Sequence, residues 1–168
     1  MNVHDTGANA PGAETLSLVD ALQVQYVRAL DRKDMPGWAA CFADPGSYVC
    51  MSREGVEQGL PIALMMDDNL ARIADRVKYV TDVWVGTFED YVCRHFVQRV
   101  ECSAAASGLI AVESNFMVAY TSARGTSEML VAGVYRDEVV VEGGVARFRS
   151  KTAVLDTVAT PRYLVYPV

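Results

Sequence analysis

Several features that would point to common functions are missing from this sequence. No stretch approaches the roughly 20 apolar residues that cross a membrane, and a net charge of −6 disfavours nucleic acid as a partner. The four cysteines never form a C-x-x-C pair, so neither a zinc site nor a dithiol redox motif is expected. Residues 1–13 lack a basic segment followed by an apolar run, which disfavours a signal peptide. These absences predict a cytoplasmic protein with reduced thiols.

What is present is organised around a β-hairpin over residues 128–156. Two β-rich runs meet at Gly143-Gly144. A two-residue Gly-Gly link favours a tight turn, because both positions can take a positive φ without a Cβ clash. The turn fixes the register of the two strands. The predicted opposite pairs are Val141 with Ala146, Val139 with Phe148, Tyr135 with Thr152 and Gly133 with Val154.

The other face of this hairpin is predicted to be polar. It carries Glu138 opposite Arg149. This face also carries a row of basic residues, Arg147, Arg149 and Lys151. Their charge would be balanced by the nearby acids Glu138 and Glu142. The same register places Arg136 opposite Lys151. Two like charges in that position are unfavourable unless a neighbouring carboxylate screens them.

Helical periodicity precedes the long strands. The expected elements are helices over residues 16–30, from 35 to about 43 and over 70–80, short strands over 47–51 and 59–66, and long strands over 94–102, 109–121 and the two arms of the hairpin. Asp34 would cap the second helix, and Asp67 or Asp68 the third. Helices first and four long antiparallel strands afterwards predict an α+β fold in which one curved sheet wraps the helices. We expect a mobile arm over residues 1–13 and a single domain over residues 14–168.

Several segments carry a family resemblance. They are residues 26–42 (YVRALDRKDMPGWAACF), 70–77 (LARIADRV), Arg94-His95, 114–120 (SNFMVAY), 131–137 (VAGVYRD), 147–156 (RFRSKTAVLD) and the closing YLVYPV. Their order resembles the cone-shaped NTF2-like fold and, within it, the small (β) subunit of Rieske-type aromatic-ring-hydroxylating oxygenases. Residues 53–64 (REGVEQGLPIAL) and the tail are most similar to small subunits of oxygenases for carboxylated aromatics such as salicylate, anthranilate or terephthalate.

The resemblance implies an α3β3 hexamer with a self-associated β trimer. The large (α) subunit would carry a Rieske [2Fe–2S] centre and a mononuclear iron, and this chain would be structural, with no catalytic, cofactor-binding or metal-ligating residue. The two iron centres need four histidines, whereas the sequence has only His4 and His95. Subunit contacts are expected at Arg94, His95, Tyr163 and Tyr166, since tyrosine is enriched in interface cores.

The same fold also houses small enzymes, so a pocket in the cone is the alternative. Tyr26 can be aligned with the oxyanion-donating tyrosine of ketosteroid isomerases, but their aspartate base falls on Cys50, and a thiol is mostly protonated at neutral pH. His95 would be the acid or base of a SnoaL-type isomerase, dehydratase or cyclase, or would only be hydrogen-bonded within the sheet. Asp31 and Asp34 are interpreted as a solvated turn with caps. A ligand-binding module without chemistry is the third possibility.

Overall fold

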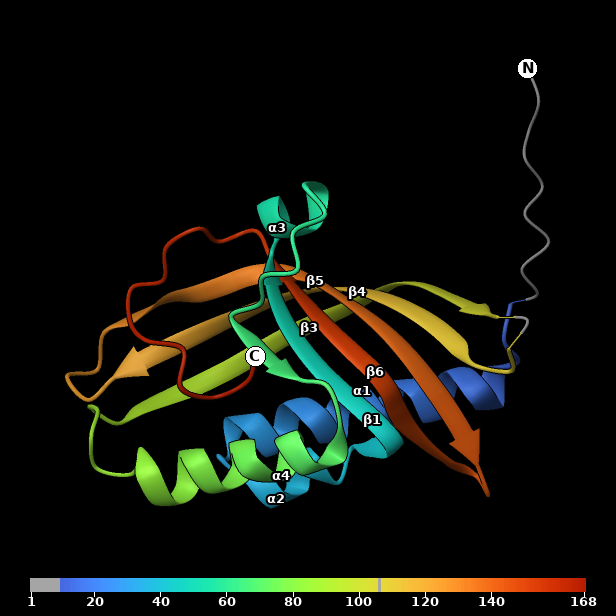
Figure 1. The fold of residues 1–168 in the computed structure, drawn as a ribbon, viewed down its shortest axis with the longest axis horizontal. Coiled ribbons are helices and arrows are strands. Elements are labelled where there is room, and N and C mark those ends of the chain that lie inside the picture. Colours follow the sequence, from blue (N-terminus) through green and yellow to red (C-terminus); the bar gives the residue numbers. More distant parts are fainter. Residues whose placement is uncertain (1–9, 106) are drawn as a thin grey trace.

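The computed structural model describes residues 10–105 and 107–168, so most of the predicted arm, including His4, lies outside the described residues. Helices α1, α2 and α4 lie on one side of a curved sheet (Figure 1). In chain order the elements are α1 (Ala13–Asp31), α2 (Met35–Ala39), β1 (Phe42–Ser52), α3 (Arg53–Glu57), β2 (Met65–Asp67), α4 (Leu70–Lys78), the π-helical turn η1 (Tyr79–Val83), β3 (Tyr91–Ala104), β4 (Ile110–Ser122), β5 (Ser127–Glu142) and β6 (Val145–Leu155).

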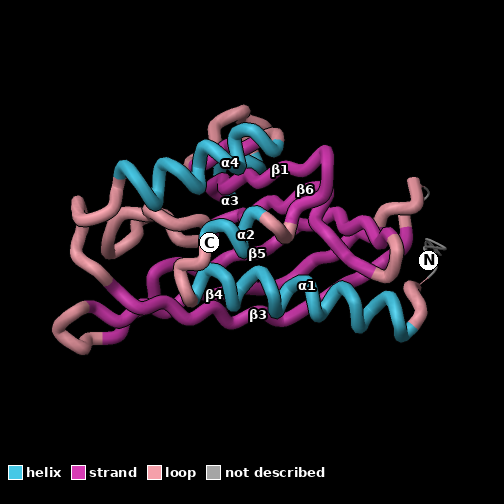
Figure 2. Tube along the Cα trace, turned by 90° about the horizontal axis from the view of Figure 1, so that it is seen from below, coloured by secondary structure: helices cyan, strands magenta, loops and turns pink. Residues whose placement is uncertain are grey.

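The long helix α1 supplies much of the core. Its buried residues recur at helical spacing and are Val19, Leu22, Tyr26, Ala29 and Leu30. Figure 2 shows α1 running beside β3 and α4 lying beside β1, so the two helices cover different parts of the same face. Among the described residues, no helix is both long and apolar enough to cross a membrane.

The six strands form one sheet in the order β2-β1-β6-β5-β4-β3. The meander from β3 to β6 is antiparallel throughout, as predicted. The sequence did not reveal that β1 pairs in parallel with β6, through partners such as Ser47 with Ser150 and Cys50 with Ala153. This pairing brings the first long strand and the last one together as the second and third strands of the sheet.

The predicted hairpin is confirmed near its turn and wrong beyond it. Gly143 and Gly144 both have positive φ, 58° and 77°, and Val141 pairs with Ala146 and Val139 with Phe148. The register then shifts by one residue, because Arg149 is left without an opposite partner in a β-bulge. Beyond the bulge Tyr135 therefore pairs with Ala153 rather than Thr152, and Gly133 with Leu155 rather than Val154.

This bulge also corrects the predicted basic row. Asp137, not Arg136, lies opposite Lys151, and Lys151 is turned into the core with no exposed side-chain surface. The predicted clash between two cations is thereby replaced by an ion pair. Because side chains alternate between the two faces of a strand, a single extra residue moves every later side chain of β6 to the opposite face.

The shorter elements differ in detail from the predictions. Strand β2 occupies only three residues, and α3 was not expected. Asp34 caps α2 as predicted, accepting a hydrogen bond from the Gly37 N–H at 2.9 Å. The predicted Asp67 or Asp68 cap of α4 is wrong. Asn69 accepts from the Arg72 N–H at 3.0 Å instead, and Asp67 is buried in an ion pair with Arg76 at 3.0 Å.

Candidate functional site

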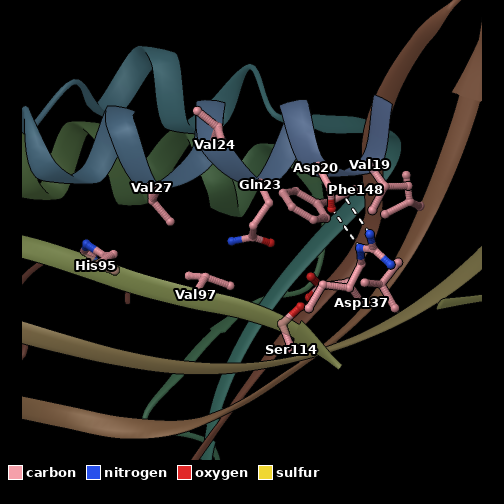
Figure 3. Close-up of a pocket in the computed structure, with 13 residues that line it drawn as sticks. Val19, Asp20, Gln23, Val24, Val27, His95, Val97, Ser114, Asp137 and Phe148 are labelled. Atoms are coloured by element: carbon pink, nitrogen blue, oxygen red, sulfur yellow. Dashed lines mark hydrogen bonds and ion pairs between the residues drawn. The ribbon is translucent and has the colours of Figure 1, made fainter. Parts of the chain in front are cut away.

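A cavity of about 300 Å³ lies between α1 and the inner face of the sheet (Figure 3). Most of its wall is apolar, made by valines of α1, β3, β4 and β5 together with Phe148 of β6. The polar side chains that line it are Asp20, Gln23, His95, Arg99, Ser114 and Asp137. An apolar cavity with a few polar groups is the usual form of a small-molecule site.

His95 reaches this cavity because the side chains of β3 alternate between its faces. The His95 side chain is only 3% exposed, and its Nδ1 lies 2.7 Å from Oδ1 of Asp31, the last residue of α1. The same oxygen accepts from the His95 backbone N–H at 3.1 Å. The interpretation of Asp31 as part of a solvated turn is therefore wrong, since the end of α1 packs on β3. The other ring nitrogen, Nε2, is buried without a hydrogen-bond partner among the described residues.

A second buried polar group joins β5, β6 and α1. The ammonium of Lys151 lies 2.9 Å from Asp137 Oδ2 and donates to Gln23 Oε1 at 3.2 Å. It also lies within 4.5 Å of the centres of three aromatic rings, those of Tyr135, Phe148 and Tyr26. Burial lowers the pKa of Lys151 and raises the pKa of Asp137, and each partner's charge opposes the shift of the other.

The three residues of the predicted alternative pocket are not brought together at this cavity. His95 lines it, but Tyr26 and Cys50 do not. The Tyr26 hydroxyl instead donates to the Val168 carbonyl at 2.7 Å. Cys50 is fully buried on β1, and burial raises the pKa of its thiol to about 12. A thiol in that state is no general base at neutral pH, so a stand-alone isomerase built on these residues is not favoured.

The four residues expected at subunit contacts lie in different settings. Arg94 is exposed on the outer face of β3, whereas the His95 side chain faces the interior. Tyr163 is 80% exposed. Tyr166 is half-buried, with its ring centre 6.3 Å from that of Tyr91. Contact with another subunit stays a prediction for these residues.

The outer face of the sheet carries several exposed apolar side chains, which together we call the outer patch. Its members are all 43% to 58% exposed and are Val92, Phe96, Val100, Met117 and Met129. Phe96 lies opposite Met117 in the β3–β4 ladder. The patch spans three neighbouring strands on the side of the sheet that α1 does not cover.

Of the six polar residues of the cavity, sequence reasoning identified only His95, although two of the missed residues had a signal. Asp137 lies between Tyr135 and Val139 at a strand position that shares their apolar face, so the alternation already placed it inside. Gln23 lies one turn after the buried Val19 on α1. Residues 10–105 and 107–168 contain no group of three or more histidine, cysteine, aspartate or glutamate side chains placed to hold a metal ion.

Comparison with known proteins decides the family. The model of the ring hydroxylating beta subunit family matches residues 25–161. The chain belongs to this family. It is the small subunit of an aromatic-ring-hydroxylating dioxygenase, and a small subunit works with a large-subunit partner. The predicted NTF2-like α+β fold is confirmed as well.

Individual relatives agree with this assignment. This β subunit is 29% identical to the anthranilate 1,2-dioxygenase small subunit of Burkholderia cepacia, over 88% of this chain and 90% of the relative. It is 20% identical to subunit beta 2 of the terminal oxygenase component of terephthalate 1,2-dioxygenase from Comamonas sp, over 89% of this chain and 96% of the relative. A crystal structure from Novosphingobium aromaticivorans, assigned as the β subunit of an aromatic-ring-hydroxylating dioxygenase, superposes with a TM-score of 0.78 at 28% identity, covering 86% and 91% of the two chains.

Proposed function

We propose that this chain is the structural small subunit of a Rieske non-haem iron oxygenase of aromatic catabolism in the cytoplasm. The observation that carries the proposal is the family match over residues 25–161. The Rieske [2Fe–2S] centre and the mononuclear iron would both lie on the large subunit. The small subunit would hold large subunits in a ring, so that the Rieske centre of one faces the iron of its neighbour.

The proposed assembly is an α3β3 hexamer built on a β trimer. The outer patch supports a partner on that side of the sheet, because exposed apolar side chains on adjacent strands are a common mark of protein contacts. Arg94 lies on the same face and Tyr163 projects from the tail, so both could contribute. Tyr166 would support the contact indirectly, by packing on Tyr91. His95 would support it by holding the backbone of β3 that positions Arg94.

The proposed substrate class is an aromatic carboxylate. Two relatives are named for anthranilate and terephthalate, both of which are aromatic carboxylates. The segment over residues 53–64 supports the same class by its resemblance to subunits of such oxygenases. Binding of the substrate itself would fall to the large subunit.

Co-expression with a large subunit identified in the same genome tests the proposal. That partner should contain the C-x-H and C-x-x-H pairs of a Rieske centre. We expect the two chains to co-purify as a coloured complex whose mass, from light scattering on a sizing column, fits three copies of each. With its reductase the complex should oxidise salicylate, anthranilate or terephthalate. A folded, iron-loaded large subunit that is active and forms the ring of three without this chain would overturn the proposal.

A further inference from the structure

We propose that copies of this chain join head to tail, with the loop over residues 60–64 of one copy lying in a groove on the outer face of the next copy's sheet. The inference rests on the β trimer of the proposed function. It adds the two surfaces that form the contact and the way in which they pair.

The loop over residues 60–64 exposes a cluster of apolar side chains. Leu60, Ile62 and Leu64 are 40% to 65% exposed. The loop follows α3, and Figure 1 shows α3 on the side of the sheet opposite to α1, α2 and α4. By contrast, α1 and α4 together expose one large apolar side chain among the described residues, that of Val24. Apolar side chains exposed together on one side of a protein are a mark of a contact surface.

A groove of about 500 Å³ crosses the outer face of the sheet over β3, β4 and β5. Phe96 and Met117 of the outer patch belong to its apolar lining. Gln98 and Asn115 also line it, and they lie opposite each other in the β3–β4 ladder. Their amides can donate to and accept from the peptide groups of residues 60–63, which belong to no helix or strand. The groove therefore matches the loop in both its apolar and its polar groups.

The loop and the groove lie toward opposite edges of the sheet. The loop leads into β2, which is one edge strand, whereas Phe96 lies on β3, which is the other. Because β1 and β3 are four strand positions apart, or about 19 Å, the loop is distant from Phe96 of its own chain. A surface that meets its own copy forms a twofold dimer, whereas two different surfaces joined head to tail generate a ring. Three copies joined in this way would close the β trimer.

The charged residues beside the two surfaces have opposite signs. Arg94 lies on the outer face of β3, and its guanidinium donates to the carbonyl of the neighbouring Cys93 at 2.7 Å. It forms no ion pair with a carboxylate among the described residues. Beside the loop, Glu54 and Glu57 of α3 are exposed and are likewise outside every ion pair in the described part of the chain. A head-to-tail contact would bring these acids toward Arg94, and complementary charges at the rim of an interface favour the correct orientation.

Cysteine cross-linking of the full chain, alone and in the complex with its large subunit, tests the contact. Ile62→Cys and Phe96→Cys place one thiol on each surface. The four native cysteines are buried or half-buried, so the wild type is the control. With a short bismaleimide, we expect the chain that carries both substitutions to form covalent dimers and trimers. The two single variants should form a covalent dimer when co-expressed, and neither should cross-link by itself more than the wild type.

The other outcomes separate this inference from the proposed function. Covalent dimers from one single variant alone would mean that a surface meets its own copy, which would overturn the head-to-tail pairing. A complex with three copies of each subunit, or a trimeric chain, that gives no cross-link between the two surfaces would overturn this inference and leave the proposed function intact. A chain that stays monomeric and does not bind the large subunit would overturn both.

An exchange of charges tests the orientation of the contact. Arg94→Glu should weaken self-association at least about fivefold, because like charges then face each other across the rim. Adding Glu54→Arg and Glu57→Arg should recover most of that loss. Arg32→Glu, at an exposed residue at the end of α1, is the matched control and should associate like the wild type. Sedimentation measures the isolated chain, and the yield of covalent trimer from the double-cysteine chain measures the complex. An unrecovered loss in the combined variant would contradict the orientation.

Discussion

Lys151 and Asp137 form an ion pair across β5 and β6, with Nζ 2.9 Å from Oδ2 and neither side chain more than 1% exposed. The bulge at Arg149 creates this relationship, because it shifts the register so that the two residues lie opposite each other. Removing two charges from water is costly, and the attraction between them offsets the cost only while both are present. The ion pair therefore stabilises the observed register of the hairpin.

Substitution of one partner should reveal this dependence. Lys151→Met leaves Asp137 buried without a cation, so we expect the free energy of unfolding to fall by about 3–5 kcal/mol. The double variant Lys151→Met with Asp137→Leu should recover most of that loss, because no charge then remains buried. Urea denaturation at pH 7.5 measures all three chains. A double variant no more stable than Lys151→Met would argue against a charge effect.

The same variant should acquire a distinctive pH dependence. Burial raises the pKa of Asp137, and Lys151 lowers it, so removing Lys151 leaves burial unopposed. A carboxyl whose pKa is higher in the folded state than in the unfolded state binds more protons when folded. The stabilisation that such a carboxyl contributes to the folded protein is present at low pH and is lost as the pH rises. The unfolding free energy of Lys151→Met should therefore be closer to that of the wild type at pH 5 than at pH 8.

Cys50 should make the native protein sensitive to alkali. Burial raises the pKa of its thiol from 9.0 to about 12 in the folded protein. Between those values the unfolded chain loses the proton while the folded chain keeps it, so stability falls as the pH rises. The loss is at most about 1.4 kcal/mol per pH unit for this thiol. Urea denaturation at pH 8, 9, 10 and 11 should show a shallower decline in Cys50→Ala than in the wild type, and parallel declines would contradict the assignment.

The tail should depend on two tyrosine hydroxyls in the core. Tyr26 donates to the Val168 carbonyl at 2.7 Å, and the Tyr48 oxygen accepts from the Val168 N–H at 3.0 Å. Tyr26→Phe keeps the ring and removes the donor, so we expect a loss of about 1 kcal/mol in unfolding free energy and faster cleavage by trypsin after Arg162. Tyr163→Phe, at an 80% exposed residue, is the matched control and should behave like the wild type.

The outer patch should matter for assembly rather than for the fold. Phe96→Ser and Met117→Ser replace side chains that are 55% and 43% exposed, so the thermal midpoint of the isolated chain should change little. Binding to the large subunit, or self-association, should weaken at least about tenfold in the double variant, because such apolar contacts contribute much of the binding free energy. Sizing-column light scattering measures this effect. Val158→Ser, at a 99% exposed apolar residue elsewhere, should assemble normally.

The sequence predicted the features that depend on local patterns. Alternation and helical spacing identified α1, α4 and the four-stranded meander, and the Gly143-Gly144 turn fixed the first pairs of the hairpin. The bulge was missed because no glycine marks it and alternation resumes after Arg149. The poor match of Arg136 with Lys151 was the one local sign that the register had to shift.

The candidate site was harder to predict, because its parts are distant in the sequence. Asp31 and His95 are 64 positions apart, and their contact depends on how α1 packs across β3. No pattern within either segment specifies that packing. Val165 and Val168 of the tail are likewise buried in the chain's own core, against residues distant in the sequence.

The parallel pairing of β1 with β6 bears on how the protein is made in the cell. β1 leaves the ribosome roughly 100 residues before its partner, which at about 5–20 residues per second is a delay of about 5–20 s. Until β6 emerges, β1 has only the short strand β2 beside it, with Tyr48 opposite Asp67 and Cys50 opposite Met65, and it cannot join the rest of the sheet. Contacts so distant along the chain also slow folding. Slower synthesis at low temperature, or added chaperone, should therefore raise the soluble yield of this subunit. The gain should be larger than for a protein whose contacting residues are close together in the sequence.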